Sequence, residues 1–125
     1  MPDVMLVGHC GPDAIMLKTV AQRVLPDARV ELINDQASLD AALAREVILL
    51  VNRELDGEFN TGTGGIDLIR HLSASAVAAP MLLVSNFEDA QAQAEAAGAM
   101  PGFGKSTLYH DDTTQRLKDA ASGFE

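Results

Sequence analysis

Hydrophobic residues along this chain fall into short continuous runs separated by stretches with helical spacing. The clearest run covers residues 47–51, five large aliphatic side chains bounded by Glu46 and Asn52. A half-exposed strand would alternate apolar and polar residues, so this run predicts a strand buried on both faces. The carboxyl ends of such strands open onto the crevice where α/β sheets bind ligands. Asn52 therefore marks the edge of the sheet at which function is expected.

The remaining pattern predicts four more strands and five helices that alternate along the chain. Regular alternation of this kind indicates a parallel sheet with helices on both faces and right-handed crossovers. The predicted fold is a flavodoxin-like doubly wound (βα)5 domain, strand order 2-1-3-4-5, formed by residues 1–125 as a single unit. The other predicted strands cover residues 4–7, 28–33, 80–85 and 100–104, and the predicted helices cover residues 12–25, 38–44, 66–72, 89–97 and 113–121.

Three of these helices carry specific signals. In the first, apolar residues recur at helical spacing from Ile15 onward, which predicts an amphipathic helix that ends before Pro26. Ser38 is in position to cap the second helix. Residues 89–97 alternate Ala and Gln, a strand-like period, but both residue types favour helices and Gly98 stands where a helix would end. We therefore predict a helix there.

The connection after the central strand is unusual. Residues 56–65 form a glycine-rich segment, whereas a loop between a strand and a helix usually has roughly 2–6 residues. Its last part, Thr61-Gly-Thr-Gly-Gly65, precedes a predicted helix and offers backbone N–H groups to an anion. The alternative is that it serves only as a flexible connector.

Composition and charge narrow the classes of function. The chain has eighteen acidic and nine basic residues, a net charge of −9, which argues against nucleic-acid and anionic-membrane surfaces. The N-terminus lacks the basic flank and apolar core of a signal peptide, and no apolar run approaches the ~18 residues that span a bilayer. With one cysteine, Cys10, the sequence favours a cytoplasmic protein without an internal disulfide.

Several segments at the predicted strand ends resemble the receiver domain of bacterial response regulators, and the resemblance extends over nearly the whole chain. The best match is Ala97-Gly-Ala-Met-Pro-Gly-Phe-Gly-Lys105, which is similar to the family's Gly-Ala…Lys segment. Leu83-Val-Ser85 resembles its fourth strand, which ends in a hydroxyl residue. Gly65-Ile-Asp-Leu-Ile-Arg70 resembles the start of its third helix.

The resemblance implies a phosphorelay function in a two-component system. In receiver domains an aspartate at the end of the third strand accepts phosphate from a partner histidine, and an acidic pair after the first strand holds magnesium. A hydroxyl residue and a lysine, here Ser85 and Lys105, contact the phosphoryl group. A proline usually follows the lysine, and here that position is Ser106.

The sequence departs from this family pattern where the chemistry occurs. Asn52 occupies the phosphoacceptor position, and His9 and Cys10 occupy the acidic pair if Pro12 anchors the first loop; a shift by one residue would place Gly8 and His9 there. An amide oxygen is a far poorer nucleophile than a carboxylate, and magnesium prefers carboxylate oxygens. We therefore expect a pseudo-receiver with neither aspartyl phosphorylation nor the magnesium site, and no other metal or cofactor.

Two nearby groups leave alternatives open. Glu54 and Asp56 are carboxylates on the loop beyond Asn52 and are candidates to replace the missing aspartate, although catalysis needs placement within about half an ångström. Lys105, without its aspartate, is either a solvated surface lysine or the binding group for an acid. The acids considered are Glu54, Asp56, Asp89, a partner's carboxylate and a small anion. Ser85 either satisfies a backbone group or contacts a ligand.

Two motifs suggest other functions. Cys10 lies at a predicted helix N-terminus, where a thiol is activated, so a Cys10-dependent redox or hydrolytic enzyme is an alternative hypothesis. The pair His9 and Cys10 alone supplies too few ligands for a metal site. Gly104-Lys105-Ser106-Thr107 resembles the end of a phosphate-binding P-loop, but the glycine required five residues earlier is Ala99.

The leading hypothesis is a non-enzymatic signalling module that acts through protein contacts. Receiver resemblance suggests the fourth helix, fifth strand and fifth helix as the contact face, with a histidine kinase or a downstream regulator as partner, and a homodimer through the same face. A small-anion sensor that uses Lys105, Ser85 and the loop at 61–65 is the third hypothesis.

Overall fold

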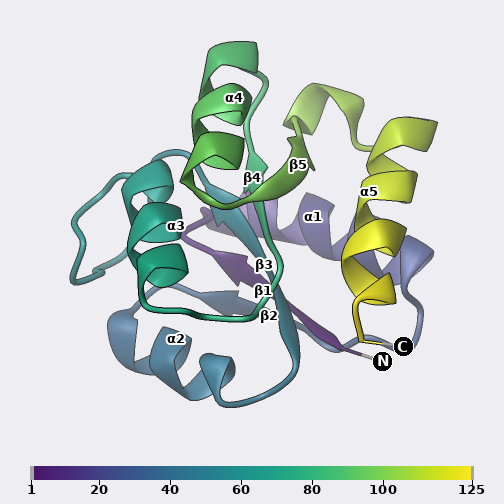
Figure 1. The fold of residues 1–125 in the computed structure, drawn as a ribbon. Helices are drawn as coiled ribbons and strands as arrows, with labels where there is room; N and C mark the ends of the chain where they lie inside the picture. Colours follow the sequence, from purple (N-terminus) through teal and green to yellow (C-terminus); the bar gives the residue numbers. More distant parts are fainter. Residues whose placement is uncertain (1, 125) are drawn as a thin grey trace.

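The computed structural model describes residues 2–124 and contains one parallel sheet of five strands in the order β2-β1-β3-β4-β5 (Figure 1). The predicted flavodoxin-like fold and strand order are confirmed. The strands are Asp3–Val7 (β1), Val30–Ile33 (β2), Val47–Asn52 (β3), Met81–Val84 (β4) and Met100–Phe103 (β5).

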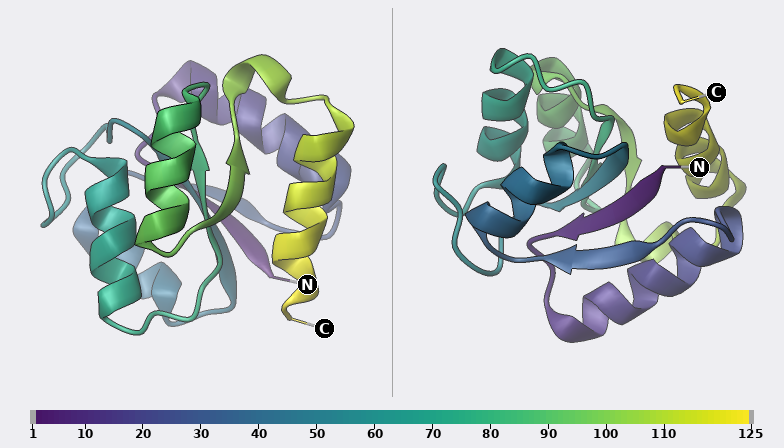
Figure 2. Two further views of the ribbon diagram at one scale, coloured as in Figure 1. Left: turned by 45° about the horizontal axis from the view of Figure 1, so that its top comes forward. Right: turned by 90° about the horizontal axis from the view of Figure 1, so that it is seen from below.

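Helices cover both faces of this sheet, as the two views in Figure 2 show. Helices α1 and α5 pack on one face, and α2, α3 and α4 pack on the other. Within the described residues, none of the helices is both long and apolar enough to cross a membrane. The helices are Gly11–Val24 (α1), Gln36–Leu43 (α2), Gly65–Ala74 (α3), Glu88–Ala97 (α4) and Asp111–Ser122 (α5), and Lys105–Thr107 forms a short 3-10 turn, η1.

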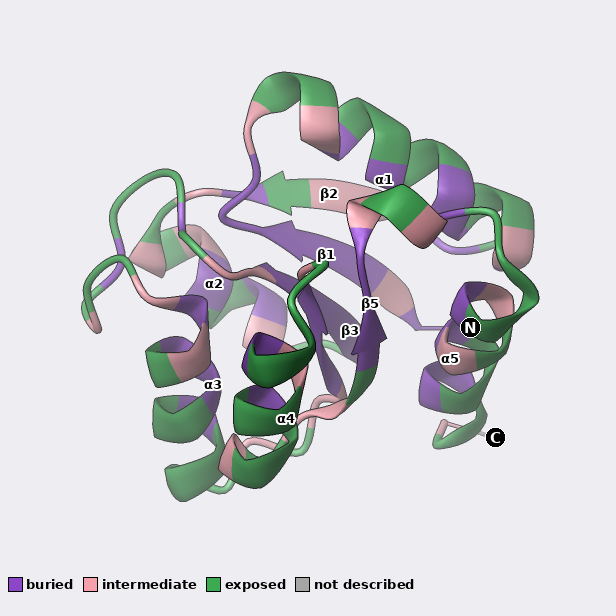
Figure 3. Ribbon diagram, turned by 90° about the horizontal axis from the view of Figure 1, so that it is seen from above, coloured by how far each residue is buried: buried purple, intermediate pink, exposed green. Residues whose placement is uncertain are grey.

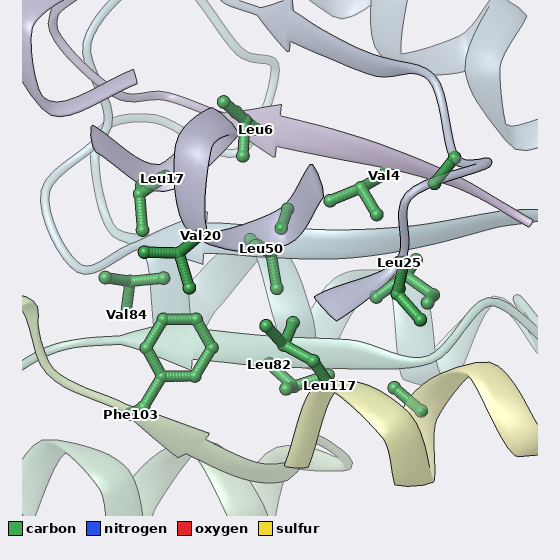
Figure 4. Packing of buried hydrophobic residues seen from close by; sticks show 14 of the residues in the cluster. Val4, Leu6, Leu17, Val20, Leu25, Leu50, Leu82, Val84, Phe103 and Leu117 are labelled. Atoms are coloured by element: carbon green, nitrogen blue, oxygen red, sulfur yellow. The ribbon is translucent and has the colours of Figure 1, made fainter. Parts of the chain in front are cut away.

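Strand β3 lies at the centre of the hydrophobic core, because its side chains alternate between two separate hydrophobic clusters. Ile48 and Leu50 face α1 and α5, whereas Leu49 and Val51 face the other three helices. Figure 4 shows the first cluster, in which Leu50 lies among side chains from α1, β4, β5 and α5. Figure 3 shows that buried residues are concentrated in the strands and on the inner faces of the helices. The continuous aliphatic run is thus explained by burial on both sides.

Local sequence signals predict helix α4 correctly, but they misplace the start of α2 and one residue of the buried face of α1. Gly98 ends α4 in the left-handed conformation with φ of 119°, so the prediction of a helix over the Ala/Gln segment is confirmed. Helix α2 begins earlier than predicted, because Asp35 caps it and accepts a hydrogen bond from the Ser38 backbone N–H at 2.7 Å. In α1 the prediction that Ile15 lies on the buried face is wrong, since its side chain is 69% exposed.

Candidate functional site

The carboxyl ends of the central strands surround a pocket of about 370 Å³. Strand register brings Asn52 level with the end of β4, because Asn52 pairs with Val84 across the sheet. Four of the five side chains selected from the sequence line this pocket: Cys10, Asn52, Ser85 and Lys105. The fold therefore assembles one site from segments that are distant in the sequence.

Asn52 uses its carboxamide as a hydrogen-bond donor to the backbone. Its Nδ2 donates to the Gly8 carbonyl at 3.0 Å and to the Glu54 carbonyl at 2.7 Å. An ionised aspartate carries no hydrogen and would place negative oxygens against these two carbonyls. The amide therefore ties the end of β3 to the β1 loop and to its own loop. Since the nitrogen is held by the backbone, the amide oxygen is the atom left for the pocket.

Lys105 is paired with Asp13. Lys105 Nζ lies 2.5 Å from Asp13 Oδ2, and both side chains are about three-quarters buried. The hydrogen bond from Lys105 lowers the pKa of Asp13 below its ordinary value. None of the three carboxylates of this chain considered from the sequence is the partner, so Glu54, Asp56 and Asp89 were the wrong candidates.

Asp13 is the functional residue that sequence reasoning missed. It lies in the first turn of α1, where an acid also complements the positive end of the helix. The signal that would have found it is its place in the first turn of a helix that starts at the carboxyl edge of β1, the edge at which Lys105 also lies. The ammonium is thus neutralised within the chain, and the pocket holds a closed ion pair rather than a free cation.

His9 does not share the pocket with Cys10, although the two residues are adjacent. The His9 ring is completely buried, and its Nε2 donates to the Leu50 carbonyl at 2.8 Å. Burial lowers the pKa of His9 to about 4, so the ring is neutral near pH 7. Its Nδ1 has no hydrogen-bond partner among residues 2–124. Neither ring nitrogen contacts the Cys10 thiol, so this structure pairs no histidine base with Cys10.

Cys10 itself ends the β1 loop and precedes α1 directly. Its thiol lies close enough to Asp13 to contribute, after the larger effect of Lys105, to the lowered pKa of that carboxyl. The thiol therefore lies beside a carboxylate and not beside an imidazole.

The hydroxyl at the end of β4 supports the backbone of the next loop. Ser85 Oγ accepts a hydrogen bond from the Phe87 N–H at 3.2 Å. Next to it, Asn86 Oδ1 accepts from both the backbone N–H and the hydroxyl of Ser106, at 3.1 and 3.0 Å. The loop after β4 is thereby joined to the turn after β5, and Ser106 acts here as a donor at the position where receivers usually have proline.

A second amide that the sequence did not reveal lies just behind this loop. Gln91 of α4 directs Nε2 at three backbone carbonyls, those of Leu83 at 2.9 Å, Ser85 at 3.1 Å and Phe103 at 3.3 Å. Room for it depends on Gly102, because a Cβ there would lie 2.7 Å from Gln91 Oε1 and 2.1 Å from the Leu83 carbonyl oxygen. Gln91 thus fastens α4 to the carboxyl ends of β4 and β5.

The long loop after β3 is more ordered than a simple flexible connector. Backbone hydrogen bonds join Leu55 to Thr63 at 2.8 Å and Gly65 to Arg53 at 2.8 Å. Phe59, in the middle of the loop, is buried against the α2–α3 side of the core. The loop forms a fixed wall of the pocket. Whether the segment 61–65 binds an anion stays a prediction.

The acidic groups around the pocket do not form a metal-binding cluster. Asp13, Glu54 and Asp56 line it, but Asp13 is bonded to Lys105 and the other two lie on the loop beyond β3. Over residues 2–124 there is no group of three or more His, Cys, Asp or Glu side chains placed to hold a metal ion. The geometry of the strand ends supplies an amide, a hydroxyl and an ion pair, which suit hydrogen bonding rather than nucleophilic attack.

Comparison with known proteins agrees with this architecture. No known family profile matches the sequence, and no curated relative matches it. Solved structures do match: the receiver domain of Francisella response regulator 1452, at 12% identity and TM-score 0.74, covers 100% of both chains. A response regulator from Thermotoga maritima has 20% identity and TM-score 0.72 over 98% of each chain. A response regulator receiver protein from Pseudoalteromonas atlantica has 17% identity and TM-score 0.70 over 99% of this chain and 100% of its own.

The chain has the receiver fold. At these identities the likeness establishes the fold alone, and it confirms the resemblance that the strand-end residues indicated. The roles of Asn52, His9, Cys10, Ser85 and Lys105 as equivalents of receiver positions stay predictions.

Proposed function

We propose that this chain is a receiver-type signalling module that acts through protein contacts, without aspartyl phosphorylation and without catalytic activity of its own. The observation that carries the proposal is the hydrogen bonding of Asn52, whose amide donates to the Gly8 and Glu54 carbonyls. The receiver fold supplies the class of protein. The amide at the end of β3 supplies the difference from a phosphorylated receiver.

Two features support the absence of phosphotransfer. An amide at the strand end cannot form the acyl phosphate that a carboxylate forms. Lys105, the group that would receive a phosphoryl oxygen, is already engaged by Asp13 at 2.5 Å. An incoming anion would have to break this pair and leave Asp13 without a counter-charge, which is unfavourable in a partly buried site. We propose that magnesium binding is also lost, because β3 ends in an amide in place of a carboxylate and Asp13 is already bonded to Lys105.

The proposed contact face is formed by α4, β5 and α5. A shallow hollow of about 390 Å³ lies there, lined by residues of α4, β5 and α5 that include Ala92, Glu95, Pro101 and Arg116. Arg116 donates to the Gly102 carbonyl, which holds α5 against β5. We propose that a protein partner, a histidine kinase or a downstream regulator, binds this face, or that a second copy of the chain does.

Phosphorylation is tested with beryllofluoride and magnesium, which mimic the acyl phosphate, followed by ¹H–¹⁵N NMR. Acetyl phosphate with magnesium, followed by intact mass, tests covalent transfer. We expect no added phosphate mass and no saturable shifts at Asn52, Ser85 or Lys105, whereas a receiver domain with its aspartate, run in parallel, responds to both reagents. A covalent phosphate on any residue would overturn the proposal.

The contact face is tested with a matched pair of substitutions. Ala92→Arg places a long charged side chain on the exposed surface of α4, and Ala41→Arg does the same on α2, away from this face. Binding of the candidate kinase or regulator and sedimentation of the free protein are measured for both. We expect Ala92→Arg to abolish the contact and Ala41→Arg to leave it unchanged. Equal behaviour of the two variants would place the contact elsewhere.

A further inference from the structure

A second and larger groove adjoins the pocket at Asn52. It has a volume of about 990 Å³ and lies between the loop after β3 and helices α3 and α4, which run side by side in Figure 1. Arg53, Glu54, Asp56 and Phe87 line both cavities, so the groove continues directly from the candidate site. A molecule seated in the groove would reach the edge of the sheet where Asn52 lies.

The two arginines in this groove are already occupied. Arg70 donates to Asp67 at 2.9 Å, one turn apart on α3. The Arg53 guanidinium lies over the Phe87 ring, 5.0 Å from its centroid, and 3.5 Å from a Glu54 carboxylate oxygen. Both positive charges of the groove are thus neutralised by contacts within the chain.

Two of the four carboxylates in the groove have no such partner. Asp56 on the loop and Asp89 in the first turn of α4 are exposed, and neither forms an ion pair within residues 2–124. Two arginines against four acids leave the lining with a net charge of −2. The unpaired acids come from separate elements on either side of the groove, so a ligand with two separated positive charges would match them.

The groove also presents apolar surface to a ligand. Ile66 lines it and is half-buried, whereas Leu55 and Ala90 lie in its floor and are largely buried. The Phe87 side chain is 61% exposed, so its ring offers apolar surface to a ligand. Apolar contact area flanked by charges of one sign is the combination that favours a peptide segment over a simple ion.

We propose that this groove docks a basic, partly apolar segment of a protein partner, with its arginine or lysine side chains on Asp56 and Asp89 and an aliphatic side chain against Phe87 and Ile66. A second copy of this chain is disfavoured as the occupant, because each copy carries a net charge of −9. The proposal goes beyond the contact face formed by α4, β5 and α5, and it stands whether or not that face binds a partner.

The test is an NMR titration of ¹⁵N-labelled protein at 0.15 M salt. The probe is the peptide acetyl-Arg-Leu-Arg-Leu-Arg-amide, and the comparison peptide has glutamine in place of each arginine. We expect saturable shifts confined to residues 53–67 and 87–93 with the arginine peptide only. The double variant Asp56→Asn/Asp89→Asn should weaken binding by about tenfold, the loss of two ion pairs near the surface.

The matched control is Asp111→Asn/Asp112→Asn, which removes the same charge from the first turn of α5, outside the groove. It should change the affinity by less than about twofold, the effect of net charge alone at this ionic strength. Shifts spread over all acidic surfaces, equal weakening by both double variants, or equal binding of the glutamine peptide would each overturn the proposal. None of these results bears on beryllofluoride binding, so failure here is distinguishable from failure of the proposed function.

Discussion

The carboxyl edge of the sheet is held together in two different ways along its length. After β1 and β3, His9 donates to the Leu50 carbonyl and Asn52 donates to the Gly8 carbonyl. Asp13 in α1 also reaches across to Lys105 beyond the end of β5, so titratable groups make two of these three contacts. On the β4–β5 side, the amides of Asn86 and Gln91 make the contacts. On both sides, side chains satisfy backbone or loop groups. Only the side after β1 does so with groups, His9 and Asp13, whose charge changes at acidic pH.

This difference separates the part of the edge that responds to solution conditions from the part that does not. Near the pocket, protonation would place a positive charge on the buried His9 ring and would remove the negative charge with which Asp13 holds Lys105. Beside α4, Gln91 and Asn86 keep the same hydrogen bonds over the whole range in which proteins fold. The contact face proposed for α4 and β5 would thereby keep its hydrogen bonds while the pocket changes.

His9 should produce the largest effect. Its folded pKa of about 4 lies below the ordinary value of 6.5, so its contribution to stability is complete above pH 6.5 and is lost as the pH falls through 4. The difference corresponds to roughly 3 kcal/mol of unfolding free energy. Urea unfolding at pH 7 and pH 4 measures it. In His9→Asn this pH-dependent part should vanish, although the variant is less stable at pH 7.

The control for His9 is His110→Asn, an exposed position before α5. This variant should keep the pH dependence of the wild type. If His9→Asn and His110→Asn show the same slope, the buried ring is not the group that titrates, and the contrast between the two sides of the edge loses its main support.

Gln91 should produce the next largest effect, and one independent of pH. In Gln91→Ala the carbonyls of Leu83, Ser85 and Phe103 lose their shared donor, which should lower the unfolding free energy by about 1–3 kcal/mol. The same loss is expected at pH 5 and pH 8. Gln93→Ala, exposed on the same helix, is the matched control and should stay within about 0.5 kcal/mol of wild type. Equal stability of the two variants would contradict the role given to Gln91.

The substitution Asn52→Asp should make the hydrogen bonds of this side chain depend on pH, which those of the amide do not. The carboxylate cannot donate to the Gly8 and Glu54 carbonyls, so we expect a loss of about 1–2 kcal/mol at pH 7. At a pH below 4 the protonated acid recovers one donor and part of the loss. Urea unfolding at the two pH values measures both effects. Wild-type stability of Asn52→Asp at pH 7 would show that these two hydrogen bonds contribute nothing.

The sequence predicted the sheet well because burial on both faces of β3 leaves a continuous aliphatic run. It also placed Asn52, Ser85 and Lys105 at one edge, since strand ends of a parallel sheet meet there. It did not predict the opposite environments of His9 and Cys10, because neighbouring residues in a turn point in different directions and no periodicity applies.

Asp13 and Gln91 were not predicted from the sequence for a different reason. Asp13 and Lys105 are 92 positions apart, and only the packing of α1 near the end of β5 brings them together. Gln91 looked like one more helix-forming residue in an Ala/Gln segment, and the need for it arises from three carbonyls on other elements. Long-range pairing of single polar side chains leaves no pattern in the sequence.

The smallest effect belongs to the Asp13–Lys105 pair, and a pKa measurement is the sharper way to detect it. A partly exposed ion pair contributes only about 0–1 kcal/mol, which is close to the error of unfolding experiments. Lys105 lowers the pKa of Asp13, so the pair stabilises the fold above the ordinary carboxyl pKa, and this is lost as the pH falls through the folded value. In Lys105→Met the titration midpoint of the Asp13 carboxyl carbon, followed by ¹³C NMR, should therefore rise.

Asp35 provides the internal control in the same spectra. Its pKa is lowered by the Ser38 backbone N–H at the start of α2, a contact that Lys105 does not touch, so its midpoint should stay unchanged in Lys105→Met. A rise at Asp13 alone would establish that the pair forms in solution and that the pocket lacks a free cation. Unchanged midpoints at both positions would mean that Lys105 is free. The pocket would then offer the unpaired ammonium of Lys105 to an anion, as the sensor hypothesis requires.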